Sequence, residues 1–119
     1  MAKSIVAEKS YRFAIRIINL YKLLCDSKRE YVLSKQMLRS GTAIGALLKE
    51  AEHAQSKPDF LNKVNIALKE ANEVLYWLML LKDTDYISEK EFESIAIDAG
   101  ELIKMLVSIV KTTKTNLGK

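Results

Sequence analysis

The feature that most constrains the fold is the helical spacing of apolar residues along almost the whole chain. These residues recur at i, i+3, i+4 and i+7, a spacing that places them on one face of an α-helix. Polar segments near 26–30, 55–58 and 82–85 interrupt the pattern. We therefore predict helices at roughly 4–25, 32–54, 58–82 and 88–111. Four long helices with short connections predict an all-α, up-down-up-down antiparallel four-helix bundle that forms a single domain over residues 1–119.

Two of the predicted helices begin with capping signals. Ser56 precedes Pro58 and Asp59, which fits an N-cap residue followed by proline in the first turn. Ser88 and Glu91 have the spacing of a capping box. These signals fix the beginnings of the third and fourth helices.

Composition excludes several classes of protein. Only 1 proline and 4 glycines occur among 119 residues, which argues against collagen-like and turn-rich β folds. Cys25 is the single cysteine, so a disulfide scaffold is excluded. No apolar run approaches the roughly 20 residues of a membrane span, and the N-terminal segment lacks the apolar core of a signal peptide. We expect a soluble, cytoplasmic protein that does not bind membranes.

The residues that carry enzyme and metal chemistry are few and scattered. Glu50 and His53 have the i, i+3 spacing found in di-iron bundles, but the motif occurs once where such a centre needs two copies. Cys25 has no histidine partner in the sequence that would make it a nucleophile. The sequence therefore predicts no catalytic residue, no metal site and no cofactor, and we expect a protein that is not an enzyme.

Basic residues are concentrated in the first half of the chain. Residues 1–60 contain 11 basic and 6 acidic residues, and residues 61–119 contain 8 and 9, which gives the formal net charge of +4. A basic stripe can be an ordinary solvated face or a surface that neutralises phosphates, with Tyr11 or Tyr31 within reach of it. In an oligomer the stripe is repeated around the symmetry axis. The candidate nucleic-acid contacts on the first two helices are Lys9, Arg12, Arg16, Lys35 and Arg39.

Gly41 and Gly45 lie in the middle of the second predicted helix. Two glycines inside a helix cost about 2 kcal/mol relative to alanine. Their i, i+4 spacing places them on one face, where they allow close approach of another backbone. The approach can be packing within the chain or contact with a ligand, and the sequence leaves both interpretations open.

The third predicted helix is apolar beyond its core-facing stripe. The additional residues are either scattered exposed side chains or a subunit interface anchored by Trp77. A homo-oligomer is the interpretation we follow. The candidate interface residues are Ile66, Tyr76, Trp77 and Leu80.

The chain contains several characteristic strings, which are LSKQMLRSGTAIGA at 33–46, EA at 50–51, Ser56 with Asp59, Phe60 and Lys63, IALKEA at 66–71, YWL at 76–78, and YIS at 86–88 with Phe92. Together they resemble one family, the "four helix bundle protein" family, also called the 23S rRNA intervening-sequence protein family. The resemblance extends from about Tyr11 to Val110. Ala43 and Leu47 depart from it, because serine and asparagine are frequent there in the family.

This resemblance implies a left-handed bundle that assembles as a ring, with a homopentamer favoured. Many members of the family are encoded within insertions in bacterial ribosomal RNA genes, and no enzymatic activity is attached to it. The accessory proteins of diversity-generating retroelements are similar in fold, and they bind nucleic acid and a reverse transcriptase. We expect a non-enzymatic oligomer that binds RNA or DNA electrostatically; the alternative is a structural or adaptor protein whose ring docks a protein partner such as a reverse transcriptase.

Overall fold

The protein is all-α, with four helices in one domain. The computed structural model describes residues 2–118, and side chains from residue 5 onward. The helices are α1 (Ala2–Asp26), α2 (Leu33–Glu52), α3 (Lys57–Asp83) and α4 (Glu89–Leu117), and residues 2–118 contain no strand. The molecule is elongated, with extents of 51 × 23 × 21 Å.

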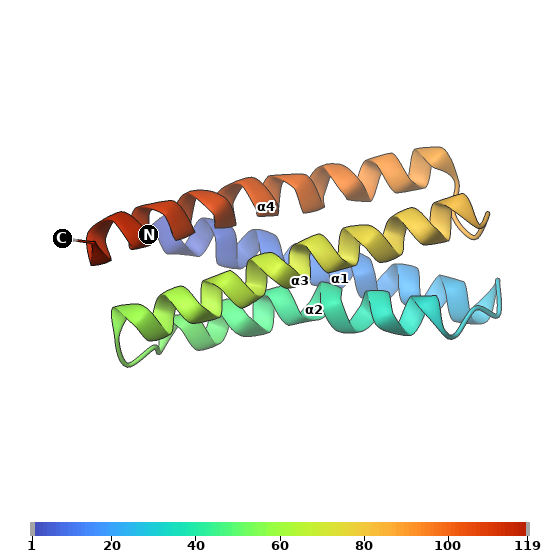
Figure 1. The fold of residues 1–119 in the computed structure, drawn as a ribbon. Coiled ribbons are helices and arrows are strands. Elements are labelled where there is room, and N and C mark those ends of the chain that lie inside the picture. Colours follow the sequence, from blue (N-terminus) through green and yellow to red (C-terminus); the bar gives the residue numbers. More distant parts are fainter. Residues whose placement is uncertain (1, 119) are drawn as a thin grey trace.

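Each helix packs against two others. α2 lies between α1 and α3, and α4 packs against α3 and α1, so helices adjacent in the sequence are adjacent in space. The α1–α2 and α3–α4 turns lie at one end of the molecule (Figure 1). The α2–α3 turn lies at the other end, beside the beginning of α1 and the end of α4.

A continuous apolar core runs along the middle of the four helices. Phe13 and Ile17 of α1 are almost completely buried, as are Ile44 of α2 and Leu78 of α3. Because each fully buried aliphatic or aromatic side chain contributes roughly 1.5–3 kcal/mol, this core is the main source of stability. The remaining members are Val6, Leu24, Met37, Leu48, Ala51, Val64, Ala67, Ala71, Val74, Leu81, Ile87, Ile95, Ala99, Leu102, Leu106 and Val110.

The capping signals at α3 and α4 have the predicted geometry. The Ser56 hydroxyl accepts a hydrogen bond of 3.2 Å from the Asp59 N–H. At α4 the Ser88 hydroxyl accepts from the Glu91 N–H, and the Glu91 carboxylate accepts from the Ser88 N–H. These bonds satisfy N–H groups that a helix N-terminus otherwise leaves without a partner.

The observed ends of α2 and α4 differ from the predicted ones. α2 ends at Glu52 rather than 54, because the N–H of His53 bonds to the Glu50 carbonyl and tightens the last turn. α4 continues to Leu117, beyond the predicted end at 111. Val110 is buried and Thr113 half-buried, so the helix still covers apolar surface at that point.

Candidate nucleic-acid interface

A buried glutamate organises the turn between α1 and α2. Glu30 is only 7% exposed, and its carboxylate accepts three backbone hydrogen bonds from the beginning of α2. The donors are the N–H groups of Val32 at 3.1 Å, Leu33 at 2.9 Å and Ser34 at 2.7 Å. Val32, at the N-cap position, provides no side-chain cap. Glu30 therefore caps α2 from outside the helix, where its negative charge also meets the positive end of the helix dipole.

These hydrogen bonds set the protonation of Glu30. Burial raises the pKa of the carboxyl, but the N–H donors of α2, with a contribution from the Ser34 side chain, outweigh it. The pKa of Glu30 is lowered below its ordinary value, and the group remains ionised. The N-terminus of α2 compensates the negative charge of Glu30, so this charge is not directed toward a binding partner.

The basic residues around this turn are left exposed. Lys22 near the end of α1, Lys28 and Arg29 in the turn, and Lys35 in the first turn of α2 are all exposed. None of the four forms an ion pair among the side chains described for residues 5–118. We call these four residues, with Tyr31, the basic turn.

Tyr31 adds an aromatic ring to the basic turn. Its side chain is 55% exposed, between Arg29 and Lys35 in the sequence. An exposed aromatic ring among cations matches surfaces on which unpaired bases stack. Asp26 is exposed nearby and offsets part of the positive charge.

The predicted basic residues of α1 are engaged within the chain. Lys9 pairs with Glu101 of α4 at 3.3 Å, and Arg16 pairs with Asp98 at 2.7 Å. Arg16 also donates to the carbonyl and the hydroxyl of Ser94. Arg12 pairs with Glu8 one helical turn earlier, at 3.2 Å. All three keep exposed surface, but their charges face carboxylates of the same molecule.

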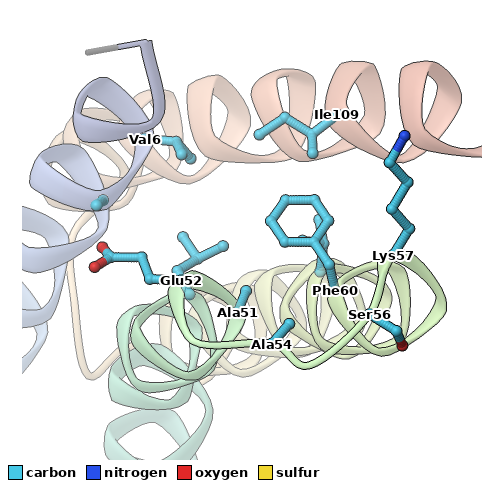
Figure 2. Close-up of a pocket in the computed structure, with 11 residues that line it drawn as sticks. Val6, Ala51, Glu52, Ala54, Ser56, Lys57, Phe60 and Ile109 are labelled. Carbon is cyan, nitrogen blue, oxygen red and sulfur yellow. The ribbon is translucent and has the colours of Figure 1, made fainter. Parts of the chain in front are cut away.

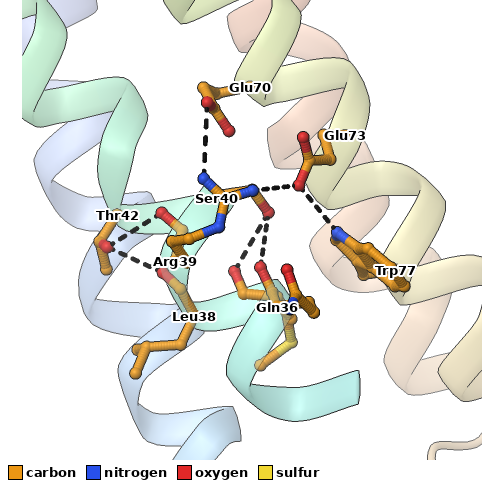
Figure 3. A network of polar contacts seen from close by, with 9 residues as sticks. Gln36, Leu38, Arg39, Ser40, Thr42, Glu70, Glu73 and Trp77 are labelled. Carbon is orange, nitrogen blue, oxygen red and sulfur yellow. Dashed lines mark hydrogen bonds and ion pairs between the residues drawn. The ribbon is translucent and has the colours of Figure 1, made fainter. Parts of the chain in front are cut away.

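Arg39 belongs to a polar network between α2 and α3 (Figure 3). Its guanidinium pairs with Glu73 and, at 3.7 Å, with Glu70. The Trp77 indole N–H donates to the same Glu73 carboxylate at 3.1 Å. One Glu70 oxygen is buried without a hydrogen-bond partner among the described residues. Of the five predicted contacts, Lys35 alone lacks a carboxylate partner among the described side chains and belongs to the basic turn.

Gly41 and Gly45 lie where α2 closely approaches α1. A Cβ at Gly41 would lie 2.9 Å from the Ile17 side chain and 3.2 Å from that of Val74 on α3. A Cβ at Gly45 would lie 3.4 Å from the Ser10 hydroxyl. Gly41 is buried and fills a contact between three helices, so its local role is packing within the chain.

The four predicted interface residues of α3 differ in exposure. Ile66, Trp77 and Leu80 are half-buried, and Trp77 also packs against the core of its own chain. Tyr76 is 55% exposed and meets Trp77 edge-on, with ring centroids 5.1 Å apart. The residues lie on one helix, but Tyr76 is the member that presents most of its surface to solvent.

Cys25 and His53 are the two residues considered as candidates for chemistry, and the structure shows what surrounds each of them. The Cys25 thiol donates to the Glu30 carbonyl at 3.8 Å, and its interaction with Tyr21 raises the pKa of that phenol. His53 is exposed at the C-terminus of α2.

In the described part of the chain, no three His, Cys, Asp or Glu side chains gather to hold a metal ion. No helix there combines the length and apolar character that a membrane span requires.

The patterns in the sequence do not single out Lys22, Lys28 or Arg29. The adjacent Lys28 and Arg29 in the polar segment after the first helix are a signal that could have indicated them. Recognising the segment as basic also requires knowing that Glu30 is turned inward. That fact depends on the fold of the turn.

Comparison with known proteins agrees with this architecture, that of an all-α, single-domain four-helix protein. The family model described as "23S rRNA-intervening sequence protein" matches residues 2–108. The chain belongs to this family, which confirms the resemblance seen in the sequence. None of the curated proteins compared with the chain matches it.

A solved structure closely resembles the fold of this chain. It is a protein of unknown function from the S23 ribosomal protein family of Bacteroides thetaiotaomicron. The identity is 57%, the match covers 93% of this chain and 99% of that one, and the TM-score is 0.92. At this identity the likeness extends to the family as well as to the fold.

Proposed function

We propose that this protein is a non-enzymatic, up-down-up-down antiparallel bundle that assembles as a homo-oligomeric ring in the cytoplasm and binds RNA or DNA electrostatically. The observation that carries the proposal is the basic turn. It holds four exposed cations without carboxylate partners among the described side chains, next to an exposed tyrosine. Such a surface suits phosphate contacts and base stacking, without readout of base edges.

The basic turn replaces the α1 stripe as the main contact in this proposal. The charges of Lys9, Arg12 and Arg16 already face carboxylates, so a phosphate would have to displace those pairs. The side chains of the basic turn have no such competitor among the described residues. In a ring, with a pentamer favoured by the family resemblance, the basic turn is repeated around an axis and binding becomes multivalent.

Fluorescence anisotropy with a labelled structured RNA, measured over a salt series, tests the proposal. We expect binding at about 50 mM salt that weakens steeply as salt rises, by about 0.9 in the slope of log K against log salt for each phosphate contact. Absence of binding, or binding indifferent to salt, would contradict it. Light scattering on the same samples tests the oligomer, and a monomer would contradict the ring.

A matched pair of variants locates the contact. Changing Lys22, Lys28, Arg29 and Lys35 to Gln should weaken binding and flatten the salt dependence. The control changes Lys69, Lys90, Lys111 and Lys114 to Gln, which removes the same charge from other exposed positions. Equal losses in the two variants would show that net charge alone acts and that the basic turn is not the site.

The second candidate is an adaptor whose ring docks a protein partner such as a reverse transcriptase. The exposed Tyr76, held edge-on by Trp77, favours it, because exposed aromatic side chains are enriched in protein interfaces. Tyr76→Ala separates the candidates. It should leave RNA binding unchanged under the first proposal and should abolish co-purification with a reverse transcriptase under the second.

A further inference from the structure

An apolar cavity lies at the opposite end of the molecule from the basic turn. Its volume is about 370 Å³, within the roughly 300–1,000 Å³ range of small-molecule sites. Figure 2 shows it between the α2–α3 turn and the helices α1 and α4. All four helices contribute apolar side chains, and the apolar lining consists of Val6, Ala7, Leu48, Ala51, Ala54, Phe60, Val64 and Ile109.

The sequence at the end of α2 explains why this space is not filled by the chain itself. After Leu48, the apolar residues there are the small Ala51 and Ala54, and α2 ends at Glu52, so the last turn of α2 fills little of the space. Phe60 stands at the centre of the cavity wall and is only half-buried (Figure 2). The pocket is partly open to solvent, and a mostly apolar lining with a few polar groups at its margin is typical of small-molecule sites.

The charges at the margin of the cavity are placed asymmetrically. Glu52 lies on the α1 side and Lys57 on the α4 side, with Phe60 between them (Figure 2). Lys57 is the first residue of α3, so it adds its charge to the positive end of a long helix. Neither Lys57 nor Glu52 forms an ion pair among the side chains described for residues 5–118.

A second cavity lies next to this site along α4. Its volume is about 350 Å³, and Val6 and Ile109 line both cavities. Lys104 stands at its margin, also without a carboxylate partner among the described side chains. Among the described residues that line the two cavities, the free cations Lys57 and Lys104 therefore lie toward α4, and the free acid Glu52 lies on the α1 side.

We propose that this cavity binds a small amphipathic carboxylate, with its apolar chain among Val6, Phe60 and Ile109 and its carboxylate paired with Lys57. The apolar lining supplies the affinity, and the lysine at the beginning of α3 selects an anionic head group. The site is separate from the basic turn, so this proposal stands independently of the proposed function.

The test compares two probes that differ only in the head group, decanoate and decanol, each below the concentration at which it forms aggregates. Titration of the ¹⁵N-labelled protein, followed by NMR, should shift the amides of residues around Val6, Ala54 and Phe60. Decanoate should bind more tightly than decanol. Each methylene removed from the acid should weaken binding by about fourfold, the effect of burying one methylene. Equal affinity for acid and alcohol, or affinity independent of chain length, would overturn the proposal.

Two variants with controls locate the two parts of the site. Lys57→Gln should weaken decanoate binding by up to about fivefold and leave decanol binding unchanged, as expected for one exposed ion pair. Its control, Lys90→Gln, lies at the other end of the molecule and should change neither. A decanoate affinity that Lys57→Gln leaves unaltered would contradict the role of that lysine.

Ala54→Leu should fill the cavity and weaken both probes alike. The control Ala46→Leu places the same side chain on the exposed surface of α2 and should leave binding unchanged. Unchanged binding in Ala54→Leu would place the ligand elsewhere. Thermal unfolding followed by circular dichroism checks that each variant is folded. If Ala54→Leu does not fold, the chain-length series with the unaltered protein still tests the proposal.

Discussion

The α1–α2 and α3–α4 turns lie at the same end of the bundle, yet they begin the next helix by different means. α4 starts with a capping box in which Ser88 and Glu91 satisfy each other's N–H groups. α2 starts after Val32, whose side chain provides no cap, and the buried Glu30 carboxylate caps the helix from outside it. The N-terminus of α4 is therefore capped by residues of its own first turn, and the N-terminus of α2 is capped by a buried carboxylate from the preceding turn.

The two turns also differ in charge as a consequence. Glu30 is buried against the N-terminus of α2, so its charge is not exposed and Lys28 and Arg29 dominate the exposed surface of the first turn. The second turn exposes Asp83 and Asp85. This end of the molecule therefore has a basic side and an acidic side, and the capping device decides which residues are exposed.

The largest effect on this comparison is expected from Glu30→Ala. The change leaves three N–H groups at the beginning of α2 without their acceptor, and we expect the free energy of unfolding to fall by about 2 kcal/mol. Urea unfolding measures the loss. Glu93→Ala, at an exposed position near the beginning of α4, is the control and should change little. Equal losses would show that Glu30 is not the cap of α2.

Acid should distinguish the two turns next. Because the pKa of Glu30 is lower in the folded than in the unfolded protein, its contribution is fully present above the ordinary value near 4.5 and is lost as the pH falls through the folded pKa. Urea unfolding at pH 7 and pH 3.5 should show that Glu30→Gln destabilises the protein at the higher pH and that the gap to the unaltered chain narrows at the lower one. A gap that stays constant with pH would contradict the ionised cap.

Ser88→Ala is expected to have a smaller effect than Glu30→Ala. It removes one acceptor of the capping box, which costs about 1 kcal/mol at a typical N-cap. Thermal unfolding measures the loss, and Ser108→Ala at an exposed position in α4 is the control. A larger loss for Ser88→Ala than for Glu30→Ala would reverse the ranking of the two caps.

Glycine in each turn is expected to have effects no larger than that of Ser88→Ala. Arg29 and Asp85 occupy the left-handed region, with φ of 53° and 68°. Arg29→Gly should relieve strain and should be more stable than Lys28→Gly by about 1 kcal/mol, since Lys28 lies outside that region. The gain for Asp85→Gly should be smaller, because aspartate tolerates this conformation better than arginine. Thermal unfolding of the three variants tests the order.

The sequence predicts the cap after the α3–α4 turn well and the cap after the α1–α2 turn poorly, because the two caps use different types of residue. Ser88 and Glu91 act within a single helical turn, so their spacing alone identifies the beginning of α4. Glu30 also acts locally, on the N–H groups of Val32, Leu33 and Ser34, but glutamate is not a usual N-cap residue, and the sequence shows it only as one member of a polar segment. The Arg12–Glu8 pair follows helical spacing, whereas Lys9 and Glu101 meet only because α1 packs beside α4. The cavity at the α2–α3 turn likewise exists only in three dimensions.

The order of helix contacts has a consequence for how the chain folds. α1 with α2, α2 with α3, and α3 with α4 pair close to one another along the sequence, whereas α1 and α4 must meet from opposite ends of it. Chains dominated by such local contacts fold fast, and the α1–α4 contact closes the longest loop. That seam is bridged by the exposed Lys9–Glu101 and Arg16–Asp98 pairs and is bordered by cavities rather than by continuous packing. We therefore expect partial unfolding to start by separation of α1 from α4, with the amide protons along these two helices exchanging with solvent before those of α2 and α3.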